Sequence, residues 1–120
     1  MPTTDPTQVH VASPTDLLTA IPTMLGTPPK ECLVLVGVSE TTVTAAALIE
    51  LRHVASPGVM PAAFHSIRRS FATGVIVVVY TDTHARTDLL AEPLETLSVH
   101  VNLEMEALLL VRRGELQPLA

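Results

Sequence analysis

The chain has 120 residues, enough for one domain with its own core, and almost all of its hydrophobic content is aliphatic or alanine. It has one tyrosine, two phenylalanines and no tryptophan, which argues against a carbohydrate site, an aromatic cage or a base-stacking platform, because these need exposed rings. The net charge of −5 argues against nucleic acid as a partner, since binding to phosphates depends on many Lys and Arg side chains.

Residues 1–12 contain two prolines and show no periodicity, so they are predicted to form a flexible arm before a single domain over residues 13–120. The N-terminus has neither the positive start nor the apolar stretch of a signal peptide. No apolar run approaches the roughly 20 residues that a membrane-spanning helix needs. We therefore expect a cytoplasmic protein without a membrane partner, and the single cysteine allows no internal disulfide.

The first predicted element is a helix with Ser13 as N-cap and Pro14 in its first position. Gly26 and the two prolines that follow it end the helix, and Pro22 is expected to bend its last turn. Its apolar face has helical spacing and consists of Leu17, Leu18, Ile21, Met24 and Leu25.

Two strands are predicted next, over residues 32–38 and 43–51, and they are expected to form an antiparallel hairpin. A second helix is predicted from Pro61 to Gly74, and residues 75–81 read as another strand buried on both faces. The apolar stripe of this second helix consists of Met60, Ala63, Phe64, Ile67 and Phe71.

A third helix is predicted to begin with Asp82 or Thr83 as its cap, and Pro93 is expected to kink it or to split it into two pieces. Leu90, Leu94 and Leu97 are expected to face inward. Residues 98–106 are compatible with loop, strand or helix, and a last strand ends in a turn at Gly114. The order α-β-β-α-β-α-β predicts a small α/β domain, with helices packed on a mixed sheet whose central strands are residues 33–38 and 75–81.

Several of these segments resemble an actinobacterial family described as domain of unknown function 4192. The matching positions are the Ser-Pro opening of the first helix, Pro22, Leu25, Gly26, Pro29 and the aliphatic run 33–36. Two positions depart from the family's pattern: Cys32 stands where serine is usual, and the segment after the second strand keeps Arg52 but has no aspartate. The resemblance implies a fold and an actinobacterial or phage lineage, and it implies no reaction.

Cys32 has two interpretations. A reactive thiol needs a lowered pKa, which Lys30, His10 or His53 could provide if they lay nearby. Free cysteine is also among the most often buried residue types and packs as a small hydrophobe. We favour packing and keep the reactive thiol as the alternative.

A candidate small-ligand or anion site follows the strand at 75–81, where the chain turns into a helix. In α/β sheets, ligands bind outside the carboxyl ends of strands, and a helix N-terminus offers free N–H groups to an anion. The candidate residues are Thr81, Asp82, Thr83, His84 and Arg86. Helix capping explains the same residue types without a ligand, and no glycine-rich phosphate loop accompanies them.

A basic patch is a third candidate, and it would suit an acidic partner or a phosphate. It consists of Arg52, His65, Arg68 and Arg69, and a solvated helix face is the simpler interpretation. No pair among the five histidines has short ligand spacing, so we predict no metal and no cofactor. No serine-hydrolase motif is present either.

These observations favour a small non-enzymatic protein-interaction or regulatory module, including a phage-encoded one that acts on a host protein. A mean hydropathy of +0.42 suggests more apolar surface than one small core can hide, and a surplus would form an exposed patch. The expected partner is a second copy of the chain or another protein. The alternative is a small-ligand sensor or enzyme that uses the 80–86 loop, with Arg52 or Arg68 supplying positive charge.

Overall fold

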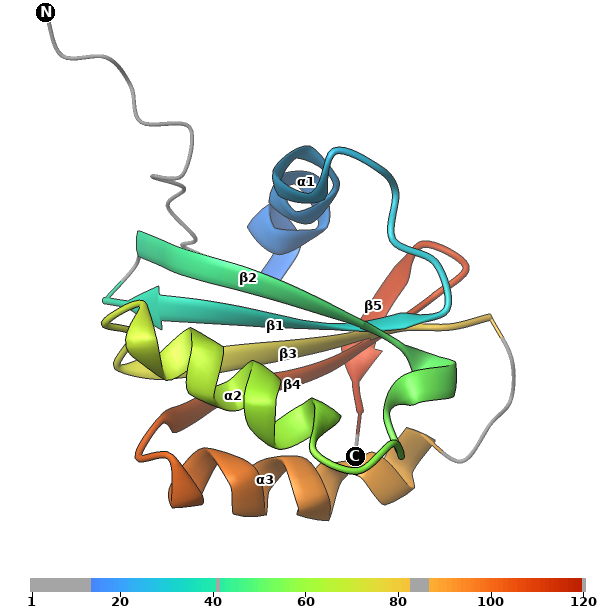
Figure 1. Cartoon of the computed structure of the whole chain (residues 1–120). Helices are drawn as coiled ribbons and strands as arrows, with labels where there is room; N and C mark the ends of the chain where they lie inside the picture. The colour runs from blue at the N-terminus through green and yellow to red at the C-terminus, as the bar shows by residue number, and fades with distance from the viewer. Residues whose placement is uncertain (1–13, 41, 83–86, 120) are drawn as a thin grey trace, which may run out of the picture.

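The computed structural model describes residues 14–40, 42–82 and 87–119, and Figure 1 shows how their elements are arranged. Along the chain these elements are α1 (Pro14–Leu25), β1 (Cys32–Ser39), β2 (Thr42–Glu50), the 3-10 turn η1 (Leu51–His53), α2 (Val59–Arg69), β3 (Gly74–Tyr80), the 3-10 turn η2 (Thr87–Leu90), α3 (Ala91–His100), β4 (Glu104–Arg112) and β5 (Glu115–Pro118). The α-β-β-α-β-α-β order is present, and β5 is added at its end. The predicted arm at 1–12 and its neighbour Ser13 lie outside the described residues.

One mixed sheet contains the five strands in the order β2-β1-β3-β4-β5. β1 is antiparallel to both β2 and β3, β3 is parallel to β4, and β4 is antiparallel to β5. The predicted hairpin is therefore confirmed. The predicted parallel crossovers are also present, because β2 and β3 are both antiparallel to β1 and so run in the same direction. The sequence did not indicate β5, since its four residues end in proline, which is not typical of a strand.

β1 and β3 lie side by side in the interior of the sheet, with Leu33 opposite Val79 and Val36 opposite Ile76. Nearly all of their residues are buried. Strands that are covered on both faces have unbroken aliphatic runs, and this composition is what predicted their central position.

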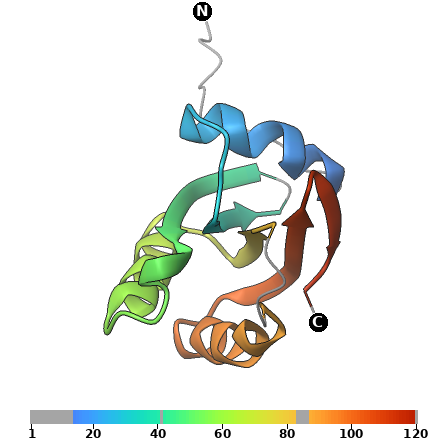
Figure 2. The ribbon, with the colours of Figure 1, turned by 90° about the vertical axis from the view of Figure 1, so that its right-hand side faces the viewer.

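Helices cover both faces of the sheet, with α1 on one side and α2 and α3 on the other (Figure 2). On the α1 side, Leu17 and Ile21 pack with Val34 and other residues of β1 and β3. On the opposite side, Phe64 of α2 and Leu94 of α3 are fully buried. The crossovers β2-α2-β3 and β3-α3-β4 advance across the sheet in the same direction, so crossovers of one handedness place α2 and α3 on the same face.

α2 ends earlier than the sequence predicts. The apolar spacing continues from Ile67 to Phe71, but the helix stops at Arg69. Phe71 has a left-handed φ of 67° and its side chain is 85% exposed, so its predicted place in the apolar stripe is wrong. Gly74 is the first residue of β3 and does not end the helix.

α3 begins later than the sequence predicts. The 3-10 turn η2 precedes it, and Pro93 lies in its first turn, where the missing N–H costs little. The helical segment is in two pieces, but they meet between Leu90 and Ala91, before Pro93, and not at the proline. Leu90 occupies the N-cap position, so Asp82 is not the cap, and Thr83 lies outside the described residues. Among the described residues, no helix is long and apolar enough to cross a membrane.

Candidate functional site

A hollow of about 240 Å³ lies where the parallel strands β3 and β4 end and β1 begins. We call it the carboxyl-end hollow. It is lined by Pro29, Lys30, Glu31, Tyr80, Thr81, Asp82, Val111, Arg113 and Gly114. This is the position in an α/β sheet where ligands bind preferentially.

Glu31 connects the segments around this hollow. Its Oε2 accepts a hydrogen bond from the Thr81 hydroxyl at 2.8 Å, and its Oε1 accepts one from the Asp82 N–H at 3.1 Å. Its backbone carbonyl accepts the Leu51 N–H at 3.1 Å. Asp82 Oδ1 in turn accepts the Arg113 N–H at 2.7 Å. The two carboxylates therefore hold the loop before β1, the end of β3 and the β4–β5 turn in one arrangement.

The β4–β5 turn is a two-residue loop of Arg113 and Gly114, since the residues on either side of it are paired. Their φ values are 51° and 78°. Positive φ at both central positions is the type I′ geometry, which matches the twist of a β-hairpin. Glycine adopts it freely and arginine does not, so the hydrogen bond from the Arg113 N–H to Asp82 helps to fix this turn.

The charges around the hollow are mixed. Lys30 and Arg113 are both exposed, and neither forms an ion pair with any described residue. Glu31 and Asp82 accept hydrogen bonds from neutral donors, as given above. Both cationic side chains thus remain available at the same opening.

Tyr80 also lines the hollow, and only 8% of it is exposed. Its hydroxyl has no hydrogen-bond partner among the described residues. Burial, together with the negative charge of a Cys32 thiolate on the neighbouring strand, raises the pKa of Tyr80 to about 12. Buried polar groups nearly always have partners, so this hydroxyl requires an explanation.

The opposite end of the sheet has an apolar groove of about 530 Å³, between the ends of α2 and α3 and the starts of β3 and β4. Phe71 and Val99 are its most exposed apolar members, at 85% and 77%. We call it the Phe71–Val99 groove. Its lining residues are Arg68, Phe71, Ala72, Thr73, Val99, Asn102, Leu103 and Glu104.

A family model described as Domain of unknown function (DUF4192) matches residues 14–116. This chain belongs to the DUF4192 family. The matched range contains α1, α2, α3 and β1 to β4, so the carboxyl-end hollow and the Phe71–Val99 groove are both features of the DUF4192 domain itself. A comparison with proteins of curated function gave no match.

Two members of the site predicted at the 80–86 loop, Thr81 and Asp82, line the carboxyl-end hollow of this DUF4192 domain. Thr83, His84 and Arg86 lie outside the described residues. The sequence pattern did not indicate Lys30, Glu31 and Arg113 as members of the site. The sequence predicted a turn at Gly114, but only the pairing of β1, β3 and β4 places this turn beside Thr81.

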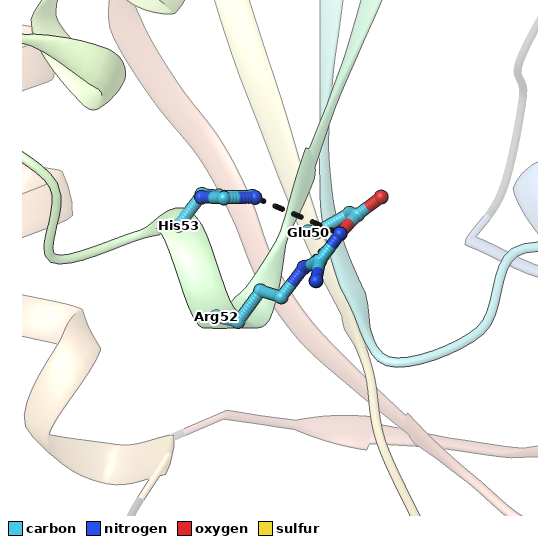
Figure 3. A network of polar contacts seen from close by, with 3 residues as sticks. All are labelled: Glu50, Arg52 and His53. Carbon is cyan, nitrogen blue, oxygen red and sulfur yellow. Dashed lines mark hydrogen bonds and ion pairs between the residues drawn. The ribbon is translucent and has the colours of Figure 1, made fainter.

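Arg52 is engaged in an exposed cluster shown in Figure 3. Its Nε donates to Glu50 Oε2, and His53 Nε2 lies 3.8 Å from the same oxygen. Arg52 also lines a second hollow, of about 500 Å³, together with Lys30 and Glu31. Arg52 thus lies at the same end of the sheet as the carboxyl-end hollow.

The structure does not bring the four members of the predicted basic patch together. His65, Arg68 and Arg69 are exposed on α2, and Arg68 lines the Phe71–Val99 groove. α2 has 11 residues and is about 16 Å long, so Arg52 before its start is far from Arg68 at its end. Arg68 lies near the start of β3, whereas Thr81 and Asp82 follow its end, so Arg68 does not supply positive charge to these two residues; the rest of the 80–86 loop lies outside the described residues.

Cys32 is 1% exposed and packs in the core on the α1 side of the sheet. Burial raises the pKa of its thiol, the charges of Glu31 and Glu50 raise it further, and a hydrogen bond from the Lys30 backbone opposes them. A nucleophilic thiol needs the opposite shift and an accessible sulfur. These observations support the packing interpretation of Cys32. Among the described residues, no group of three His, Cys, Asp or Glu side chains is placed to hold a metal ion.

Proposed function

We propose that this DUF4192 domain is a non-enzymatic protein-interaction module, and that it associates with a second copy of itself through the Phe71–Val99 groove. The observation that supports this most directly is the conformation of Phe71. It is the most exposed large apolar residue of the described chain, and its backbone is left-handed.

The free energy of this arrangement is unfavourable for an isolated domain. A left-handed backbone costs a non-glycine residue about 1–2 kcal/mol. The exposed ring gains no free energy of burial that would offset this cost, whereas full burial of a phenylalanine side chain contributes about 1.5–3 kcal/mol. A partner that covers Phe71 and the neighbouring Val99 would therefore offset the backbone cost.

A second copy suits this groove because a two-fold interface must be complementary to itself. The lining combines apolar residues with one side chain of each charge sign, Arg68 and Glu104. In a two-fold contact, Arg68 of one copy can face Glu104 of the other, and this pair occurs twice. The pairing also counteracts the general repulsion between two copies that each carry a net charge of −5.

Light scattering coupled to size-exclusion chromatography tests the proposal over a series of concentrations. The expected mass of the wild type shifts toward that of a dimer as concentration rises, and Phe71→Asn remains a monomer. Asparagine tolerates the left-handed backbone, so this variant keeps the fold while it removes the apolar contact. Leu89→Asn is the matched control, because Leu89 is 62% exposed and does not line the groove.

Charge reversal identifies the occupant as a second copy. Arg68→Glu and Glu104→Arg each create like charges across the two-fold axis, so each variant alone is expected to be a monomer. An equimolar mixture of the two pairs opposite charges at both positions and should form a heterodimer. A wild type that stays monomeric at its highest soluble concentration, or a mixture that does not associate, would show that the groove does not bind a second copy.

A further inference from the structure

β2 is an edge strand, which pairs with β1 on one side and with no strand on the other (Figure 1). The two edges of the sheet differ in how they are protected against further pairing. β5, at the opposite edge, has four residues, begins with a charged Glu115 and ends in Pro118. β2 has nine residues, and its stretch from Thr42 to Ile49 contains no proline and no charged side chain. An edge of this kind is a template for an additional strand.

The register shows which backbone groups of β2 face the open side. The Leu51 N–H donates to the Glu31 carbonyl at 3.1 Å, in continuation of the pairing between β1 and β2. Hydrogen-bonded and non-hydrogen-bonded pairs alternate along an antiparallel ladder, so the backbone groups of Ala46, Leu48 and Glu50 point away from β1. They form no hydrogen bond with the described residues outside the strand pair. Their N–H and C=O groups are complementary to the backbone of another extended chain.

A hollow beside the end of β2 adds a requirement for a side chain. It is the hollow of about 500 Å³ that Arg52 lines, and we call it the Leu48 hollow. Leu48, which is 41% exposed, lines it together with Pro28, Pro29 and Leu51. Side chains alternate between the two faces along a strand, so an added strand can place one large apolar side chain in this hollow while its backbone pairs with β2.

A second copy of β2 does not meet this requirement. In a two-fold hydrogen-bonded pair the strands run antiparallel, so the start of the second copy's β2 would approach the Leu48 hollow. That start, residues 42–46, has only threonine, valine and alanine side chains, and a register shift makes it irregular. Two copies with a net charge of −5 also repel each other, whereas a basic segment is attracted.

We infer that the outer edge of β2 binds an extended, basic and proline-free segment of another protein, which adds a strand to the five-stranded sheet and inserts a large apolar side chain into the Leu48 hollow. In this mode of recognition, main-chain hydrogen bonds provide affinity and the hollow provides specificity. The surface shares no lining residue with the Phe71–Val99 groove, so the inference does not depend on the proposed self-association.

Amide hydrogen exchange of the full chain, measured by NMR, tests the strand pairing. In the protein alone, the amides of Ala46 and Leu48 should exchange quickly, whereas those of Ala47 and Ile49, which face β1, should exchange slowly. The probe is an acetylated peptide amide of sequence Lys-Thr-Val-Phe-Val-Thr-Lys, for which we expect a dissociation constant of about 0.1–1 mM. At saturation it should slow exchange at Ala46 and Leu48 by about tenfold or more.

Variants of the peptide and of the protein test the two parts of the contact. N-methylation of the peptide amides on one side of its backbone should abolish binding, and methylation on the other side should not. Alanine in place of the peptide's phenylalanine should weaken binding about tenfold. Leu48→Lys should have a similar effect, because it removes an apolar contact and charges the edge. Leu89→Lys is the matched control and should bind like the wild type, since Leu89 is 62% exposed and does not line the Leu48 hollow.

Phe71→Asn separates this inference from the proposed self-association, because it lacks the groove contact and should bind the peptide like the wild type. The absence of saturable shifts at Ala46 and Leu48, or equal binding by the wild type and Leu48→Lys, would overturn the inference. So would exchange at Ala46 and Leu48 that slows with protein concentration in peptide-free Phe71→Asn, because a second copy would then cover the edge.

Discussion

Replacement of Tyr80 by phenylalanine is expected to make the domain more stable. The side chain is 8% exposed, and its hydroxyl has no partner among the described residues. Burial of a polar group without a hydrogen bond costs about 1–3 kcal/mol. Phenylalanine keeps the ring and removes the hydroxyl, so the free energy of unfolding should rise by about 1–2 kcal/mol at neutral pH. For a domain of this size, that corresponds to an increase in Tm of roughly 4–8 °C.

The pH dependence of the free energy of unfolding, compared between the wild type and Tyr80→Phe, provides a second test. Because the pKa of Tyr80 is raised to about 12 in the folded protein and is about 10 in an unfolded chain, the folded state retains the proton between these values. Ionisation of Tyr80 therefore leaves the free energy of unfolding unchanged below pH 10 and lowers it as pH rises from 10 toward 12. Between pH 9 and 11 the wild type should lose about 1.3 kcal/mol that Tyr80→Phe does not lose.

The assay is direct because Tyr80 is the only tyrosine and the chain has no tryptophan. The ultraviolet absorbance of tyrosinate therefore reports this residue alone, and the denatured chain provides the reference titration. Urea unfolding of both proteins at pH 7, 9 and 11 supplies the free energies. A native titration midpoint near 10, or a Tyr80→Phe protein less stable than the wild type at pH 7, would show that the hydroxyl is solvated or already has a partner.

Two further predictions concern packing and the Glu31 hydrogen bonds. Gly37→Ala should lower the free energy of unfolding by about 1–2 kcal/mol in chemical denaturation, because the added Cβ would lie 2.8 Å from Ile67 Cγ2. Gly74→Ala should cost less, because the nearest atoms to its added Cβ belong to a flexible glutamate side chain. A larger loss for Gly74→Ala than for Gly37→Ala would contradict the packing argument. Glu31→Ala should cost about 2 kcal/mol through its two lost side-chain hydrogen bonds. Glu40→Ala, at an exposed left-handed position, should cost little, and equal losses would assign the effect to the backbone.

The fold was predictable where a periodic pattern and its end signals agree. Unbroken aliphatic runs predicted β1 and β3 as central strands, and helical spacing with a glycine stop predicted α1. Phe71 shows where this reasoning fails. The apolar spacing continues past Ile67, but the chain leaves the helix at Ser70, and nothing in the residue types marks that point. A pattern cannot distinguish an apolar residue that faces the core from one that follows the helix on the surface.

The candidate site was only half predictable for a different reason. Thr81 and Asp82 follow a recognisable strand, so their place at its carboxyl end could be expected. Glu31 and Arg113 come from positions 51 and 31 residues away from their partners in this network. Their convergence depends on strand order and register, which a single sequence does not contain. Local patterns therefore indicated where a site could form, and long-range pairing decided which side chains complete it.

Left-handed backbone conformations occur at both ends of the sheet. Among the described residues, five that are not glycine have positive φ, and four of them line either the carboxyl-end hollow or the Phe71–Val99 groove. Turn chemistry accounts for Asn102, which tolerates this conformation, and for Arg113 in its type I′ turn. It does not account for Glu31 or Phe71, since neither residue type favours a left-handed backbone. Strain of this kind persists where the surrounding structure enforces it, and it concentrates at binding sites. The hydrogen bonds of Glu31 provide that enforcement at the hollow. The exposed ring of Phe71 has no such support among the described residues, and the proposed contact with a second copy would supply it.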